Sequence, residues 1–283
     1  IYGYILGKPA MSTIEKLKKL KDFVKSLESV VVAFSGGVDS SLVAKVCFDV
    51  LGSKALAVTA RSETYPSHEY EEARKIAKEI GINHLTIDTS ELGIEGFAQN
   101  PPNRCYFCKS ELFSKLKGIA TEKGFKNVAD GANLDDAGEY RPGLDAAREL
   151  EVRSPLKECG LRKADIREVS KYLKLTNWDK PSYACMSSRF PYGQSITEEK
   201  LVIVSAAEDY LRGLGLKQFR VRHHDTIARI EALPQDFAFL LQNDRRVELI
   251  KKFKEIGYKY VTIDIEGYRS GSMNEVLTMT NVA

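Results

Sequence analysis

Apolar residues in the first half of the chain follow two alternating patterns. Short runs rich in β-branched residues, of which Val30 to Phe34 is the first, have the length of buried parallel strands. Before and between these runs, stretches such as 12–27 place apolar residues three and four positions apart, which is helical spacing. The alternation predicts an α/β fold built on a doubly wound five-stranded parallel sheet. The expected strands are 30–34, 55–59, 84–87, 128–130 and a short one near Val152.

The pattern changes after an irregular segment, 181–193, that is rich in polar and aromatic residues. Segments of this kind carry functional residues more often than packing residues. Two helical patterns and three strand patterns follow it, and they predict a small α+β module with an antiparallel sheet. We therefore place a domain boundary after Gly193, between a larger domain at 11–193 and a C-terminal domain at 194–283.

Composition and charge narrow the function classes. No apolar run in the 283 residues approaches the roughly 20 that span a membrane, so we expect no membrane partner. The net charge of +3 is too small to indicate a nucleic-acid partner. Five cysteines without a secretory signal favour a reducing compartment, and we expect a cytoplasmic protein. Met11 is the expected native start, because residues 1–10 lack the features of a signal peptide.

The clearest chemistry follows the first strand, where the sequence reads S-G-G-V-D-S and then enters a helical pattern at 39–51. Gly36 and Gly37 allow the backbone to fold tightly and to approach a ligand. The amides at the start of the helix favour an anion, and three serines add hydroxyl donors: Ser35, Ser40 and Ser41. The stretch predicts a phosphate cradle without the Walker lysine, and the alternative is an ordinary strand-to-helix turn.

Three of the five cysteines stand in segments with expected function. Cys105 and Cys108 form a C-x-x-C at a loop-to-helix step, and Cys185 lies in the irregular segment. The pair alone fits a redox dithiol, half of a zinc site or part of a cluster. Three cysteines would leave one iron of a [4Fe–4S] cluster without a protein ligand. Cys47 is expected to pack inside a helix, and Cys159 is treated as incidental.

Several motifs together resemble one family. S-G-G-V-D-S resembles the PP-loop of the ATP pyrophosphatases, which cleave ATP between its α and β phosphates. The further motifs R-C-Y-F-C-K, W-D-K-P-S-Y-A-C-M-S-S-R-F-P-Y-G and R-V-R-H-H-D-T-I-A-R-I-E extend the resemblance to LarE proteins, over nearly all of Met11 to Ile265. LarE proteins are ATP-dependent sulfur transferases that act in making the nickel-pincer nucleotide. The resemblance implies a PP-loop domain at 11–193 and a substrate and oligomerisation domain at 194–283.

The resemblance also implies a reaction and its site. With ATP and Mg²⁺, the enzyme would adenylate a carboxylate of a pyridinium mononucleotide, and a sulfur nucleophile would displace AMP to leave a thiocarboxylate. Asp39, acting through Mg²⁺, and Cys185 would be catalytic. The implied ATP-binding residues are Ala33, Phe34, Ser35, Gly36, Gly37, Asp39, Ser40, Thr59 and Arg61.

A phosphate site for the acceptor substrate is implied at Ser188, Arg189, Arg220 and Arg222. The last two arginines alternate along a strand and so share one face, where the alternative is a solvated strand surface. Glu231 could bind a metal or orient an arginine, and the alternative is a surface glutamate.

The sulfur source divides the family into two types. Some LarE proteins give up the sulfur of their own cysteine at the position that Cys185 matches, and others bind a [4Fe–4S] cluster through three cysteines. This sequence resembles the cluster type, with Cys105, Cys108 and Cys185 as ligands and sulfide or another sulfur donor as a partner. The alternatives are the sacrificial type, with Cys185 as donor, and a PP-loop tRNA thiolase. We further expect a homo-oligomer, because the C-terminal module is small.

Overall fold

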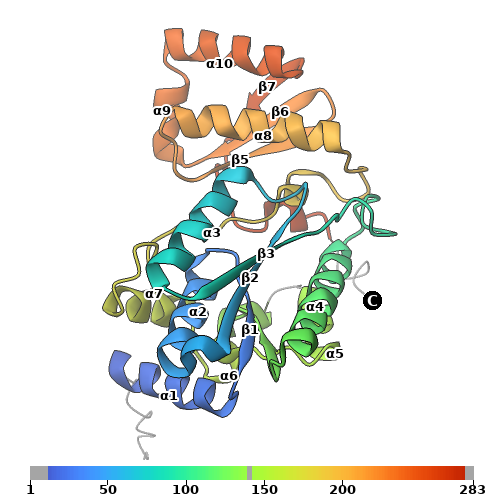
Figure 1. Cartoon of the computed structure of the whole chain (residues 1–283). Coiled ribbons are helices and arrows are strands. Elements are labelled where there is room, and N and C mark those ends of the chain that lie inside the picture. The colour runs from blue at the N-terminus through green and yellow to red at the C-terminus, as the bar shows by residue number, and fades with distance from the viewer. Residues whose placement is uncertain (1–11, 139–141, 278–283) are drawn as a thin grey trace, which may run out of the picture. The chain divides into compact units, whose positions relative to one another are not determined.

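The computed structural model describes residues 12–138 and 142–277 (Figure 1). The expected start at Met11 lies outside these residues. The chain divides into two compact units, and the first comprises the described residues up to Ala60 together with 69–87 and 110–180. The second comprises 61–68, 88–109 and the described residues from Pro181 onward. The irregular segment 181–193 thus packs within the second unit, and the domain boundary after Gly193 stays a prediction.

The first unit is built on a parallel sheet with the strand order β3-β2-β1-β4. Its strands are β1 (Val30–Ala33), β2 (Ala55–Arg61), β3 (Asn83–Asp88) and β4 (Asn127–Ala129). The central strand β1 consists of three fully buried valines and a half-buried alanine, as expected for a strand that is covered on both faces. The predicted α/β class and parallel sheet are confirmed.

The prediction of a fifth strand in this sheet is wrong. Near Val152 the pairing is limited to a single parallel bridge between Ala129 and Arg153. Glu151 has a left-handed backbone, with φ of 53°, and this ends any extended stretch on one side. On the other side Pro155 begins a short helix, and it also lacks the N–H that a ladder would need.

Helices cover the sheet of the first unit. They are α1 (Thr13–Ser26), α2 (Val38–Leu51), α3 (Ser67–Ile80), α4 (Arg104–Lys123), α5 (Gly143–Glu149), α6 (Pro155–Glu158) and α7 (Lys163–Tyr172). α1, α2 and α7 pack against one another, and Figure 1 shows α2 and α4 on opposite sides of the sheet. Val30 and Val32 of β1 join the core cluster that holds Leu20 and Val43, whereas Val31 points to the other face.

The second unit contains a sheet with the order β5-β6-β7, formed by β5 (Phe219–His224), β6 (Ile227–Ala232) and β7 (Tyr260–Ile263). β5 and β6 are antiparallel, but β6 and β7 are parallel, so the predicted all-antiparallel sheet is wrong. The long connection through α9 (Phe237–Leu240) and α10 (Asn243–Ile256) returns the chain to the starting end of β6, which permits parallel pairing. α8 (Glu198–Gly213) and α10 supply the core partners of this sheet.

None of the helices within 12–138 and 142–277 is both long enough and apolar enough to cross a membrane.

Candidate active site

The turn after β1 has the backbone that a phosphate-binding loop requires. Gly36 has φ of +66°, and a Cβ at this position would lie 2.7 Å from the Cα of Ala73 in α3. A side chain is therefore excluded by both the backbone conformation and the close approach of α3. Gly37 is the N-cap of α2, and no side chain of the described residues caps that helix. The amides at the start of α2 therefore remain available to an anion.

Serine hydroxyls and one distant amide side chain fix this loop. The Ser40 hydroxyl donates to the Gly37 carbonyl and accepts from the Ser35 amide, both at 3.2 Å. The buried Asn177 side chain donates to the Gly36 carbonyl and to the Ser41 hydroxyl, both at 2.9 Å. Asn177 was not among the predicted site residues, although it directly precedes the W-D-K-P-S motif.

Asp39 lies in the first turn of α2 and forms an ion pair with Lys163, the first residue of α7. Lys163 binds Oδ2 of Asp39, while Oδ1 is buried and has no hydrogen-bond partner among the described residues. A carboxylate oxygen without a partner fits a site for a hard cation such as Mg²⁺. Lys163 was not among the predicted site residues.

Gly131, at the carboxyl end of β4, closes the other side of this turn. A Cβ on Gly131 would lie 2.9 Å from the Ser40 amide nitrogen and 3.2 Å from the Cβ of Asp39. The carboxyl ends of β1 and β4 therefore meet at the start of α2, where ligands bind in open parallel sheets.

Thr59, near the end of β2, uses its hydroxyl to hold Phe34, which leads from β1 into the loop. Its hydroxyl lies 2.8 Å from the Phe34 carbonyl, to which it donates, and 2.8 Å from Nε2 of His84. Because a hydroxyl has one hydrogen, Nε2 of His84 must be the donor in the second contact. Burial, followed by the charge of Arg74, lowers the pKa of His84. Phe34 is itself buried, and its amide donates to the Val58 carbonyl at 2.9 Å, so its backbone polar groups serve the sheet.

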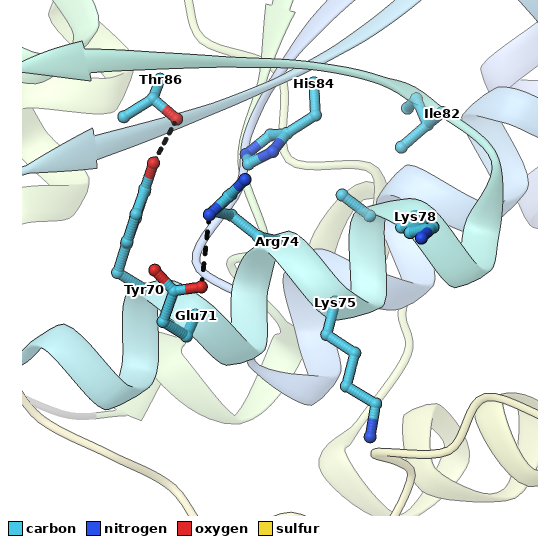
Figure 2. Close-up of a pocket in the computed structure, with 9 residues that line it drawn as sticks. Tyr70, Glu71, Arg74, Lys75, Lys78, Ile82, His84 and Thr86 are labelled. Atoms are coloured by element: carbon cyan, nitrogen blue, oxygen red, sulfur yellow. Dashed lines mark hydrogen bonds and ion pairs between the residues drawn. The ribbon is translucent and has the colours of Figure 1, made fainter.

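Figure 2 shows the surroundings of His84, which faces a groove between α3 and β3. Tyr70 bonds Thr86 across this groove at 3.1 Å, and Arg74 pairs with Glu71 at 3.3 Å. The residues that line the groove do not include the PP-loop.

Two other residues predicted to bind ATP have different surroundings. Ala33 is half-buried in β1. Arg61 belongs to the second unit, where it pairs with Asp88 at 2.8 Å.

The three cysteines Cys105, Cys108 and Cys185 all belong to the second unit. Two side chains, those of Asn100 and Glu91, connect the chain segments that carry these cysteines. Asn100 donates to the carbonyls of Phe190 (3.2 Å) and Pro191 (2.7 Å). The C-x-x-C segment is thus fastened to the segment that follows Cys185.

Glu91, which was not among the predicted site residues, makes the second connection. It accepts a hydrogen bond from the Cys108 thiol at 3.1 Å and another from the hydroxyl of Thr64. The Thr64 carbonyl in turn accepts from the Met186 amide at 3.0 Å, directly after Cys185. The cysteine segments are therefore held together from two sides.

The pKa values of the thiols follow their surroundings. Although the Cys105 side chain is exposed, the protein around its thiol is dense enough that burial raises its pKa, and the charge of Cys185 adds to the effect. Burial and then the charge of Glu91 raise the pKa of Cys108 well above its usual value. Arg104 lowers the pKa of Cys105, and Lys109 lowers both, but burial outweighs them.

No group of three or more His, Cys, Asp and Glu side chains within 12–138 and 142–277 is already arranged to hold a metal ion. The charge of Cys185 nevertheless acts on both Cys105 and Cys108, so the three thiols share one neighbourhood. Thiols are the ligand type that an iron–sulfur cluster takes, but the Cys108 thiol donates to Glu91 and would have to leave it before a cluster could bind.

Arg220 lies on β5 and is only 6% exposed, so the alternative of a solvated strand face is wrong for it. Its guanidinium donates to the backbone carbonyls of Phe219 (2.7 Å) and Ser182 (2.9 Å). It also stacks at 5.2 Å on each of the rings of Tyr183 and Tyr268. No carboxylate of the described residues forms a salt bridge with it. Burial and the neighbouring charge of Arg189 lower its pKa, which marks a cation that a bound anion would stabilise.

Arg222, two residues along the same face, is 4% exposed. It donates to Glu231 (2.7 Å), to Ser272 (2.9 Å) and to the Ser188 carbonyl (2.7 Å). Its Nε is buried and has no partner among the described residues. Glu231 is fully buried and also pairs with Arg229 at 3.2 Å, so it orients two arginines and is not a surface residue.

Comparison with known proteins gives the family. The NAD synthase family model matches residues 13–107. An uncharacterized protein of Synechocystis sp. is 48% identical over 93% of this chain and 98% of its own length. The pyridinium-3,5-bisthiocarboxylic acid mononucleotide synthase of Lactiplantibacillus plantarum is 42% identical over 92% of this chain and 94% of its own length. An uncharacterized protein of Methanocaldococcus jannaschii is 31% identical over 92% of this chain and all of its own length.

These relatives cover both units, and they confirm the resemblance that the motifs predicted at the level of the family. The chain therefore belongs to the LarE family of PP-loop ATP pyrophosphatases, that of the pyridinium-3,5-bisthiocarboxylic acid mononucleotide synthase.

Proposed function

We propose that the protein is an ATP-dependent sulfur transferase that adenylates a carboxylate of a pyridinium mononucleotide and converts it to a thiocarboxylate. The observation that carries this proposal is the 42% identity, over 94% of its length, to a synthase named for that product. The complete PP-loop and the buried arginines supply chemically matching sites for a triphosphate and for a phosphorylated acceptor.

Adenylation requires charge on the leaving pyrophosphate to be neutralised. The amides at the start of α2 would bind phosphate oxygens, assisted by the hydroxyls of Ser35 and Ser40. Mg²⁺ would be held at Asp39 and would supply Lewis-acid stabilisation of the leaving group. Lys163 would then exchange its Asp39 partner for a phosphate, because the pair is only partly buried, with side-chain exposures of 30% and 25%.

The acceptor phosphate would bind at Arg220 and Arg222, with Ser188 beside them. Arg220 has no carboxylate in a salt bridge with it among the described residues, and Arg222 keeps an unpaired Nε. Arginine suits phosphate because its planar donors form two parallel hydrogen bonds. Glu231 would keep Arg222 oriented with or without a ligand, because this ion pair is buried, and the phosphate would bind the free Nε.

For sulfur we propose the cluster type, with Cys105, Cys108 and Cys185 as ligands of a [4Fe–4S] cluster. Three thiolates leave one iron open, which is the chemistry such a cluster would supply: a position for inorganic sulfide. The alternative is that Cys185 gives up its own sulfur and becomes dehydroalanine. Both types need Cys185, but only the cluster type needs Cys105 and Cys108.

Anaerobic purification followed by iron, sulfide and zinc analysis, with an absorption spectrum near about 400 nm, tests this proposal. We expect about four irons and four sulfides per chain. Each of Cys105→Ala, Cys108→Ala and Cys185→Ala should lose the chromophore and sulfur transfer but keep ATP-dependent AMP formation. Cys159→Ala is the matched control, because this buried thiol lies in the other unit. Bound zinc, or dehydroalanine at position 185 after a single turnover, would contradict the cluster.

The choice of acceptor separates this proposal from a tRNA thiolase. Pyrophosphate release that depends on a pyridinium mononucleotide supports the proposal, and release that depends on tRNA overturns it.

A further inference from the structure

Arg189 is fully buried and stands at the end of a short 3₁₀ helix, Met186–Arg189, that begins directly after Cys185. Its Nη1 donates to the carbonyl of Ala184 at 2.8 Å and to the carbonyl of Cys185 at 3.2 Å. It also donates to the Ser188 hydroxyl at 2.8 Å. The guanidinium therefore holds the peptide groups on both sides of the cysteine.

Glu208 of α8 holds the guanidinium in turn. Its carboxylate accepts from Nε (2.7 Å) and Nη2 (2.9 Å) of Arg189. The same carboxylate accepts from the Tyr183 hydroxyl (3.1 Å) and the Val221 amide (3.0 Å). One fully buried carboxylate thus joins the cysteine turn to α8 and to β5.

The contacts of Arg189 differ from those of Arg220, its neighbour in the proposed phosphate site. The guanidinium of Arg189 donates to a carboxylate, two carbonyls and a hydroxyl. The guanidinium of Arg220 donates to two carbonyls and stacks on two aromatic rings. A buried ion pair of this kind adds little net stability, but the loss of one partner leaves a buried charge unpaired. Its geometry is therefore held firmly and is unsuited to exchange of partners.

We propose that Arg189, held by Glu208, is a positioning residue for Cys185 and acts in the sulfur-transfer step, not as a ligand of the acceptor phosphate. It fixes the backbone that directs the Cys185 thiol toward the neighbourhood of Cys105 and Cys108. The role of Cys185 in sulfur transfer rests on the proposed function, but the positioning itself does not.

Thiol alkylation measures the positioning directly. Reduced full-length protein is treated with iodoacetamide, and the rate at Cys185 is followed by peptide mass spectrometry. In Arg189→Lys and Glu208→Gln the freed turn should expose Cys185, so its rate should rise about tenfold. Cys159, a buried thiol of the first unit, is followed in the same digest as the internal reference and should stay protected. Asp209→Asn is the control variant, because Asp209 lies on α8 beside Glu208 and pairs with the partly exposed Arg212.

Kinetics give the second readout. The proposal predicts that both variants lose sulfur transfer about tenfold or more, while pyrophosphate release and the KM for the mononucleotide stay near their wild-type values. Unchanged Cys185 reactivity in folded Arg189→Lys and Glu208→Gln overturns the proposal. A raised KM for the mononucleotide with unchanged Cys185 reactivity also overturns it and assigns Arg189 to phosphate binding. A protein without sulfur-transferase activity whose Cys185 rate still rises keeps the positioning and rejects the proposed function.

Discussion

The PP-loop in the first unit and the arginine cluster in the second (Arg189, Arg220 and Arg222) both hold charge, but they hold it differently. The Asp39–Lys163 pair is partly exposed, at 25% and 30%, whereas the Arg189–Glu208 pair is 0% and 2% exposed. A partly exposed pair can exchange a partner for a ligand at little cost, because water and the ligand replace what is lost. A fully buried pair cannot, because the remaining charge would lie unpaired in the interior.

This difference in exposure separates residues that can bind a ligand from residues that hold other side chains in place. Asp39 has an unpaired carboxylate oxygen, and Arg222 an unpaired Nε, so both sites are incomplete without a ligand. The carboxylate of Glu208, by contrast, accepts four hydrogen bonds. We expect substitutions of the first kind to alter binding and catalysis, and substitutions of the second kind to alter the placement of other residues.

The largest effect is expected for Asp39→Asn, which removes the charge that would hold Mg²⁺ on the leaving phosphates. AMP formation should fall about 10³-fold, because metal stabilisation of the leaving group is lost. The measurement is acceptor-dependent pyrophosphate release under saturating Mg²⁺ and ATP. Asp49→Asn is the matched control, since Asp49 lies on the same helix and pairs with Lys45 at 2.6 Å. AMP formation at the wild-type rate would remove Asp39 from the mechanism.

Lys163→Met should reduce pyrophosphate release by about 10²-fold, somewhat less than loss of Asp39. The lysine would neutralise phosphate charge alongside the loop amides, which remain in place. Lys45→Met is the control, because Lys45 forms an ion pair of similar exposure on α2. If Lys163→Met instead gives normal turnover with lower stability, Lys163 only balances the charge of Asp39.

These two residues also show what the sequence could and could not predict. The loop itself was predictable, because strand, glycines, serines and Asp39 are consecutive and their spacing alone sets the geometry. Lys163 lies 124 residues from Asp39, and Asn177 lies 141 residues from Gly36, so no local sequence pattern predicts that they contact the loop. Their placement depends on how α7 packs on α2.

In the second unit the residue types were predicted better than their roles. The motifs identified Arg189, Arg220 and Arg222 as one set, but the alternation along a strand says nothing of burial. Glu208 lies in a helical pattern without a motif, and it is this carboxylate that makes Arg189 different from the other two. The prediction of a fifth strand was wrong for a local reason. The left-handed Glu151 and the helix that starts at Pro155 leave too few extended residues between them to pair with β4.

Arg220→Gln should raise the KM for the mononucleotide about tenfold while ATP-dependent steps stay close to normal. The expected size corresponds to the weaker end of the range for a hydrogen bond to a charged group, about 1.5 kcal/mol. Arg212→Gln is the control, because Arg212 is a partly exposed arginine that already has a carboxylate partner. An unchanged KM for Arg220→Gln, or an equal rise in the control, would show that Arg220 does not bind the acceptor.

Thr59→Val tests whether the first unit also contains a residue that holds others in place. The substitution removes the hydrogen bonds to the Phe34 carbonyl and to His84, and it should lower the free energy of unfolding by about 1–2 kcal/mol. Thr86→Val is the control, since its hydroxyl bonds Tyr70 near the groove surface. Urea unfolding of both variants gives the comparison, and equal losses would mean that the Thr59 contacts have no special role.

The smallest effect is expected in the pH dependence that His84 contributes. Burial and the charge of Arg74 lower the pKa of His84 below its ordinary value of 6.5, so the folded protein binds a proton there less readily than the unfolded chain. The free energy of unfolding should therefore fall as the pH drops below about 6.5, and it should stop falling once the pH is below the folded-state pKa. His84→Gln keeps a side-chain donor for Thr59 but does not titrate, so its stability should decline less with acid. Burial also lowers the pKa values of His223 and His224 in the second unit, and they leave a residual slope in both proteins. Urea unfolding at about pH 8 and about pH 5.5 measures the difference, and identical slopes for the variant and the wild type would show that His84 carries no pH dependence.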